Sequence, residues 1–338
     1  MRRLRHFFTV RLNWVALLIV GFFFTVALAA PWIAPPDDPA HPALYRYLEG
    51  QTQVAPLPPG PGLPLGTVAY MMDSTGGREL LHFDIFYSLV WGTRTVLRFG
   101  LLTALAAACL GITLGAIGGY VGGALNFALM RITDAFLAFP VIAGVWLFRT
   151  VMQTANMELV DYTNLTPVSI PSTPFQHLVL TLGIDPVMLT LILFSWMGYA
   201  RLINANLISL KEAEYVQAAK VAGQRPLRII FRHLLPNAIA PIIVLLARDI
   251  GGMVVMQAAF AFIGVSGTVN STAIPEWSRL LMMGRNWIMG AGGNPFLYWW
   301  LYLPVTAALI VFGIGWNLLG DGLNLTLNPH EVARKRFG

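Results

Sequence analysis

The stretch from Ser209 to Asn237 reads SLKEAEYVQAAKVAGQRPLRIIFRHLLPN and holds the densest charge in an otherwise apolar chain. Ser209 and Glu212 fit the S-x-x-E capping box, in which side chains bond the free N–H groups at a helix start. We therefore predict that a new helix begins here, with Glu214 near its dipole-favoured start and Gly223 as a left-handed stop. At about 13 residues, this helix is too short to cross a membrane.

One face of the predicted helix carries small side chains with one aromatic. Its members follow at helical spacing and are Tyr215, Ala218, Ala219 and Ala222. Pro226 suits the first turn of a second helix, which Leu235 and Pro236 end or kink. A small-residue face fits a groove on a soluble partner, whereas a membrane-surface helix would carry large apolar residues and lysines. A loop that only packs on its own bundle is the alternative.

The composition is that of an integral membrane protein. The 338 residues are 56% hydrophobic and only 11% charged, so much apolar surface must face lipid. The net charge of +6 does not indicate nucleic-acid binding, because the basic residues lie between apolar segments rather than in one stripe. Cys109 is the only cysteine, which excludes a disulfide framework and a cysteine-based metal site.

Six apolar segments are long enough to span a membrane, which needs roughly 20 residues. They predict an all-α polytopic bundle with helices at 12–30, 95–117, 131–152, 187–207, 239–263 and 297–319. The first segment has an alternative interpretation as a signal peptide, because arginines precede it and Ala27-Leu28-Ala29 resembles a cleavage site. Its apolar run is longer than a usual signal sequence and more spans follow, which favours a membrane anchor.

The distribution of lysine and arginine predicts the orientation. With both termini in the cytoplasm, 14 basic residues lie inside and seven outside, as the positive-inside rule requires. Residues 1–94 then hold a tail, the first span and a Pro-rich external loop at 31–94. Residues 95–319 form the core, with the charged loop at 209–237, and 320–338 form a cytoplasmic tail. A second external insertion covers 153–186. Prolines predict irregular, extended backbone in both external segments.

Glycines repeat every four residues in the second predicted span. Gly111, Gly115 and Gly119 form two small-xxx-small pairs, a spacing that lets two helices approach closely in lipid. Packing within the chain is the simpler interpretation, and a subunit interface is the alternative.

Charges also occur inside predicted spans. Arg248 lies ~13 Å along the fifth span, near mid-membrane, and its neighbour Asp249 faces elsewhere, so the two do not form a simple pair. Such residues line a translocation path or form a structural salt bridge with another helix or subunit. We expect Asp134 to pair with Arg131 three residues away, and Asp321 to be structural, at the cytoplasmic edge.

The charged loop resembles the EAA motif of ABC importer permeases. The matching positions are Gln217, Ala218, Ala219, Gly223, His233, Leu235 and Pro236, with Gln in place of the usual Glu and His in place of Ile. The segments 114–140, 284–287 and 317–329 are similar to the C-type subunit of the dipeptide, oligopeptide and nickel permease family. Departures include an insertion between Leu65-Gly66-Thr67 and Gly77-Arg78-Glu79, and Gln257 where glutamate is common.

The resemblance implies a pore subunit without catalytic activity. The chain has no G-x-x-x-x-G-K-[ST] motif to hold a nucleotide, so a partner ATPase uses ATP and Mg²⁺, and this chain binds no cofactor or metal. The segment 210–223 would be the coupling helix. The residues that we expect to couple to the ATPase are Glu214, Tyr215, Gln217, Ala218, Ala219, Gly223, His233, Leu235 and Pro236. Arg248, Asp249 and Gln257 are candidates for the translocation path.

The resemblance also implies the partners and the location. The partners are a second permease, one or two cytoplasmic ATPase subunits, an extracytoplasmic solute-binding protein and membrane lipid, in the inner membrane of a prokaryote. Peptides are the expected cargo, with nickel or another small solute as the alternative. An ATP-independent channel or carrier is a weaker alternative. An intramembrane enzyme would need clustered acids or histidines, whereas the six histidines are scattered.

Overall fold

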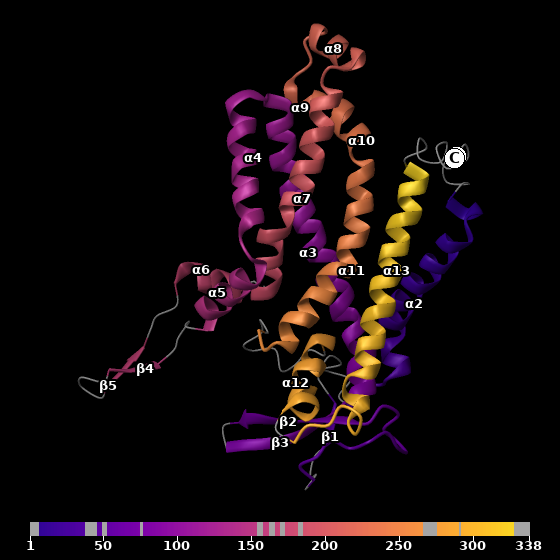
Figure 1. Cartoon of the computed structure of the whole chain (residues 1–338), viewed down its shortest axis with the longest axis vertical. Helices are drawn as coiled ribbons and strands as arrows, with labels where there is room; N and C mark the ends of the chain where they lie inside the picture. Colours follow the sequence, from indigo (N-terminus) through magenta and orange to yellow (C-terminus); the bar gives the residue numbers. More distant parts are fainter. Residues whose placement is uncertain are drawn as a thin grey trace. The chain divides into compact units, whose positions relative to one another are not determined.

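A computed structural model describes residues 7–37, 46–48, 53–74, 77–153, 158–161, 166–169, 173–181, 185–265, 276–290 and 292–327. The described chain is mostly helical (Figure 1). It divides into two compact units. Unit 1 comprises residues 1–17, 101–253 and 315–338, and unit 2 comprises residues 18–100 and 254–314. Several long helices contribute residues to both units.

Five helical segments within the described ranges are long and apolar enough to cross a membrane. They are α2 (Arg11–Ile33), α3 (Ile85–Val121), α7 (Pro186–Leu210), α11 (Ala240–Phe262) and the segment Trp299–Leu327 that contains α13 (Leu303–Leu327). A sixth apolar segment is a bent pair, α4 (Gly123–Ala138) and α5 (Val141–Gln153). The predicted all-α polytopic class is therefore confirmed.

The helix predicted at 131–152 is not one continuous helix, because α4 and α5 meet at an angle of 83°. Phe139 ends α4 in an extended conformation, with ψ of 128°. Pro140 follows it, and a proline disfavours helical backbone at the residue before it. Within unit 1, α5 then leads through the hairpin of β4 (Glu158–Asp161) and β5 (Thr166–Ser169) to α6 (Pro174–Thr181).

The core of unit 1 is built on the glycine repeat of α3. A Cβ atom at Gly111 would lie 2.3 Å from the carbonyl oxygen of Trp196, and one at Gly115 would lie 2.3 Å from that of Ala200. Gly119 approaches Asn204 in the same way, at 3.0 Å. The small-xxx-small spacing therefore serves helix packing inside the chain, of α3 on α7.

The start of α7 is capped by Asp185. Its carboxylate accepts a hydrogen bond of 2.6 Å from the Val187 N–H, and Pro186 occupies the first helical position. Burial raises the pKa of Asp185 to about 6, although the two backbone N–H groups of Val187 and Met188 oppose this shift. The carboxyl group therefore loses its proton at a higher pH than an ordinary aspartate does.

Unit 2 contains a sheet where the sequence predicts only irregular loop. Strands β1 (Tyr47–Leu48), β3 (Gly77–Asp84) and β2 (Thr67–Ser74) pair antiparallel in that order. Backbone carbonyls of β2 accept hydrogen bonds from two indoles, Trp287 of α12 (Trp277–Met289) to Ala69 at 3.0 Å and Trp300 to Thr67 at 3.3 Å. The prolines that predict loop are concentrated outside these strands.

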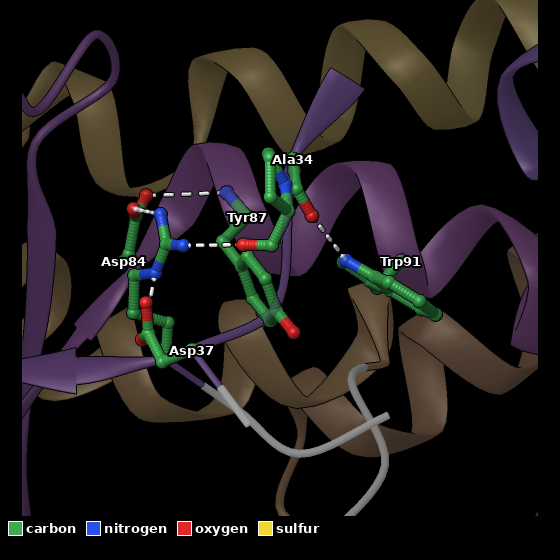
Figure 2. Close-up of polar contacts among 7 residues, drawn as sticks. Ala34, Asp37, Asp84, Tyr87 and Trp91 are labelled. Carbon is green, nitrogen blue, oxygen red and sulfur yellow. Dashed lines mark hydrogen bonds and ion pairs between the residues drawn. The ribbon is translucent and has the colours of Figure 1, made fainter. Parts of the chain in front are cut away.

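A polar cluster in unit 2 joins the end of α2, β1 and the start of α3 (Figure 2). The Arg46 guanidinium pairs with Asp37 at 2.9 Å and Asp84 at 3.8 Å, donates to the Pro35 carbonyl, and covers the Tyr87 ring at 4.8 Å. Asp84 also caps α3 by accepting the Tyr87 N–H at 3.1 Å. Burial raises the pKa of Asp84, and the Arg46 charge and the cap oppose that shift. This cap explains why α3 begins at Ile85, ten residues before the predicted start.

Two further side chains of α3 hold the last turns of α2. Trp91 donates its indole N–H to the Ala34 carbonyl at 2.8 Å, a contact also seen in Figure 2. Pro31 lies inside α2 and has no N–H for the carbonyl of Ala27, four residues before it. Arg94 donates to that carbonyl instead, and more weakly to Leu28 at 3.4 Å.

Candidate functional site

The charged loop follows α7 within unit 1, and Figure 1 shows its helix α8 at one end of that unit. The predicted capping box is wrong, because α7 continues through Ser209 to Leu210 and α8 (Glu214–Val221) begins only after a turn. Ala213 is the N-cap of α8 and provides no side-chain bond. Glu214 supplies an acid at the positive end of the helix, as the sequence indicates.

The predicted glycine stop is confirmed. Gly223 has a φ of 71°, in the left-handed region. Its N–H bonds the carbonyl of Lys220 at 3.0 Å, and the N–H of Gln224 bonds that of Ala219 at 3.1 Å. These two bonds form a Schellman motif, which satisfies the last carbonyls of α8 and reverses the chain.

The second helix of the loop contains a π-helical turn. Pro226 occupies the first position of α9 (Pro226–Ile229), as predicted, and Ile230–Leu234 is π-helical before α10 (Leu235–Ala238). Pro236 has no N–H for the Arg232 carbonyl, and the Leu235 N–H bonds Ile230 five residues back. The predicted kink at Leu235-Pro236 is therefore present as a widened turn.

His233 closes the loop on itself. Its Nε2 lies 3.1 Å from the side-chain oxygen of Gln224, the residue after the glycine stop. Because that amide oxygen can only accept, the histidine donates through Nε2. The Asn237 side chain donates to the His233 carbonyl at 2.7 Å, and the Gln217 side chain donates to the Lys211 carbonyl at 3.0 Å. These bonds hold the turns on either side of α8, while Val216 and Ala219 of α8 pack in one cluster with Ile229 and Leu234 of the following helix.

The small side chains of α8 do not share one exposed face, contrary to the sequence prediction. Ala219 is buried together with Val216, and both pack in the core of unit 1 with Ile229 and Leu234. Tyr215, Ala218 and Ala222 are exposed. Among the predicted coupling residues, Glu214, Gln217 and Pro236 are also exposed, and His233 and Leu235 are half-buried.

Three large apolar side chains extend the exposed surface of the loop, and the sequence prediction missed them. Val221 is 91% exposed, Leu227 68% and Phe231 65%. The last two are four residues apart, a helical i,i+4 spacing that could have revealed them. We call Tyr215, Ala218, Val221, Leu227 and Phe231 the outer loop surface. A surface of this kind on a short polar loop is typical of a protein interaction site.

Arg248 forms a salt bridge with another helix, one of the two predicted alternatives. Its guanidinium pairs with Asp321 of α13, and both side chains are about half exposed, at 48% and 51%. Gly320 lets the helices approach, because a Cβ there would lie 2.9 Å from Cγ of Arg248. Asp249 points elsewhere and interacts with the buried Tyr199 of α7. Gln257 is buried.

Asp134 does not pair with Arg131, so that prediction is wrong. Its carboxylate binds Arg201 of α7, 67 residues away in sequence. Arg131 instead covers the ring of Phe127 at 5.0 Å. Nearby, Asn204 of α7 donates to Asn126 of α4 at 2.6 Å. Two polar contacts, one ion pair and one hydrogen bond, therefore hold α4 against α7.

Sequence comparisons relate this chain to several known proteins. A family model described as "Binding-protein-dependent transport system inner membrane component" matches residues 111–330. The dipeptide transport system permease protein of Alkalihalophilus pseudofirmus is 31% identical over 73% of this chain and 68% of its own length. The nickel transport system permease protein of Escherichia coli is 29% identical over 94% of both chains. The glutathione transport system permease protein of Pectobacterium atrosepticum is 28% identical over 75% of this chain and 71% of its own.

Proposed function

Because this chain belongs to the family of binding-protein-dependent transport system inner membrane components, we propose that it pairs with a second, homologous permease and imports peptides. The family establishes the coarser function, a permease subunit of a binding-protein-dependent ABC importer that works with an ATPase and a binding protein. The subunit itself is not catalytic, and the partner ATPase hydrolyses ATP. We further propose that one or two ATPase subunits bind ATP with Mg²⁺, and that this chain binds no cofactor.

We place the charged loop and both termini in the cytoplasm. The support is the excess of basic residues on that side, 14 against seven. The sheet and α12 of unit 2, and the hairpin and α6 of unit 1, then belong to the extracytoplasmic side, where a solute-binding protein delivers cargo. The bacterial inner membrane is the location that this orientation supports.

The outer loop surface is the site that we propose docks to the ATPase. It is apolar, exposed and carried by a hairpin whose other face is locked into the core of unit 1 through Val216 and Ala219. A rigid hairpin of this kind transmits the displacement of its partner to α7 as rigid-body movement. The residues on the surface would contact the ATPase directly, while Ala219, Gly223 and His233 would keep the hairpin in shape.

Peptide is the proposed cargo, with nickel as the alternative. Some relatives are called dipeptide permeases and another a glutathione permease, which favours peptides, but the nickel permease is about equally similar to this chain. For the path itself we propose Asp249 and Gln257, with the Arg248 bridge at its edge. A carboxylate at this depth of α11 would interact with a cationic group of the cargo.

A substitution at Ala218 tests the docking claim. Ala218→Arg places a large side chain on the exposed surface of α8 and should leave the fold intact, yet it should reduce cargo-stimulated ATP hydrolysis of the assembled importer at least tenfold. Ala124→Arg, also an exposed alanine but at the start of α4, is the matched control. Unchanged stimulation in Ala218→Arg would contradict the docking role. Mass spectrometry of the cargo bound to the co-purified binding protein decides between peptide and nickel.

A further inference from the structure

Helix α5 has one face fixed against the protein. A Cβ at Gly144 would lie 2.7 Å from the ring of Phe194 and 3.1 Å from Thr190, both on α7. Phe139, just before α5, stacks on the same Phe194 ring at 5.2 Å. Val145 is fully buried. Because this face has no room to rotate, the opposite face of α5 must point away from unit 1.

The outward face is apolar and large. It consists of Ile142, Ala143, Trp146, Leu147, Thr150 and Val151, all exposed. The only hydroxyl, on Thr150, is already bonded to the Trp146 carbonyl at 2.9 Å. The side chain of Arg149 reaches back over the Trp146 ring, at 5.9 Å, from the edge of this face. A surface of this size and chemistry is unfavourable in water.

Helix α6 continues the same pattern. Gln176 is buried, bonds Thr173 in a capping box and donates to the Val151 carbonyl, which ties α6 to the end of α5. Phe175 and Leu178 remain exposed, at 46% and 55%. Both helices therefore expose large apolar side chains, and on α6 the polar His177 is exposed beside them.

The angle between α4 and α5 sets the orientation of α5 relative to the membrane. Nine residues of a helix that continued α4 would advance ~13 Å through the membrane, at 1.5 Å per residue. At 83° to α4, the same nine residues advance only ~2 Å along the α4 axis. Thr190 and Phe194, which α5 contacts, lie in the first turns of α7, at the end opposite α8. Because α7 is ~37 Å long and the hydrocarbon layer ~30 Å thick, α5 lies toward the boundary opposite the charged loop.

We propose that α5 and α6 form an in-plane membrane anchor whose outward apolar face lies among lipid acyl chains. The preceding helix α4 also exposes large apolar side chains, among them Ile132 and Leu137. Contacts between membrane helices favour small residues, whereas this face carries Ile, Trp, Leu and Val. Docking of a soluble protein would call for a polar rim, and a tryptophan with an adjacent arginine is typical of a membrane interface. Lipid is therefore the occupant that the chemistry favours.

Collision measurements on spin labels test the anchor. The sole cysteine is first replaced, Cys109→Ala, and single labels are placed at Ile142→Cys, Leu147→Cys and Val151→Cys in the full chain in lipid nanodiscs. We expect the ratio of oxygen to nickel-chelate collision rates to be at least tenfold higher at these sites than at Tyr215→Cys on the charged loop. The three labels should lie at the same depth within ~3 Å, because the helix is in the membrane plane.

Three outcomes would overturn the proposal. A depth change near 13 Å from Ile142 to Val151 would mean that α5 crosses the membrane. Free access of the nickel chelate would place this face in water. Exclusion of both reagents in the assembled importer would show that a protein subunit covers it. Thr150→Cys, a small change on the same face, repeats the measurement should the larger sites disturb folding. None of these outcomes depends on which solute is transported.

Discussion

Replacing Arg94 by methionine should destabilise unit 2 through the two α2 carbonyls that lose their donor. A hydrogen bond from a charged group stabilises a protein by about 1.5–3 kcal/mol, and the bond to Ala27 is of this type. The bond to Leu28 is long, at 3.4 Å, and adds little. The guanidinium also covers the Trp91 ring at 4.7 Å, which contributes about 0.5–1 kcal/mol. We therefore expect Arg94→Met to lower the free energy of unfolding by about 3 kcal/mol.

A double-mutant cycle with Pro31 isolates the reason for this loss. Pro31→Ala supplies an N–H that can bond the Ala27 carbonyl within the helix, so Arg94 is no longer its only donor. In that background Arg94→Met should lower the free energy of unfolding by only about 1 kcal/mol, which gives a coupling energy of about 2 kcal/mol. Unfolding by SDS in mixed micelles, followed by circular dichroism, measures all four proteins.

The control is Arg98→Met, one turn further along α3, where the described residues provide no hydrogen-bond partner for the exposed arginine. It should change the free energy of unfolding by less than about 0.5 kcal/mol. A coupling energy below about 0.5 kcal/mol between Arg94 and Pro31 would refute the reasoning, because the arginine would then not be replacing the bond that proline removes.

Three other predictions use the same unfolding assay. Gly115→Ala places a Cβ 2.3 Å from the Ala200 carbonyl oxygen and should lower the free energy of unfolding by about 1–3 kcal/mol. Gly21→Ala, where no atom lies within 4 Å of the added Cβ, should not lower it. Equal losses of stability in the two variants would argue against tight packing of α3 on α7. Asp185 has a raised pKa of about 6, so its stabilising contribution is complete below about pH 4 and is lost as the pH rises through about 6. Asp185→Asn keeps the cap. It should raise the free energy of unfolding by about 2 kcal/mol relative to the unmodified chain at pH 7 but not at pH 4. An increase independent of pH would exclude titration of Asp185 as its cause. Arg201→Met leaves Asp134 without its partner. Because both side chains are about half exposed, it should lower the free energy of unfolding by about 0.5–1 kcal/mol, more than Arg131→Met does. A larger loss in Arg131→Met would instead favour the local pair that the sequence suggests.

The sequence predicts the features of this fold that depend on local chemistry. Hydropathy locates the spans because each must be apolar over about 20 residues. Gly223 is recognisable as a helix stop because only glycine enters left-handed backbone freely, and the four-residue glycine repeat indicates a close helix contact. Pro140 could have revealed the bend between α4 and α5, since a proline disfavours helix at the residue before it.

Tertiary packing decides the features that the sequence prediction missed. The motif at Ser209 and Glu212 satisfies a capping rule, but α7 continues past Ser209 to Leu210, because Leu207 and Leu210 pack in one cluster with residues of α3. Asp134 has an arginine nearby in sequence and takes a distant one instead, because α4 packs on α7. Ala219 and Ala218 are chemically identical neighbours, and only the fold makes one a core residue and the other a surface residue.

The π-helical turn at Ile230–Leu234 sets the direction in which the charged loop faces. Each residue of an α-helix turns the chain by about 100°, so one residue more or fewer in this turn would rotate α9, and α8 with it, by that angle relative to α11. A single-codon deletion at this point would leave every spanning segment unchanged yet aim the outer loop surface in a different direction. Insertions or deletions in this turn could therefore adapt a permease of unchanged fold to an ATPase of different shape, because they rotate the docking surface.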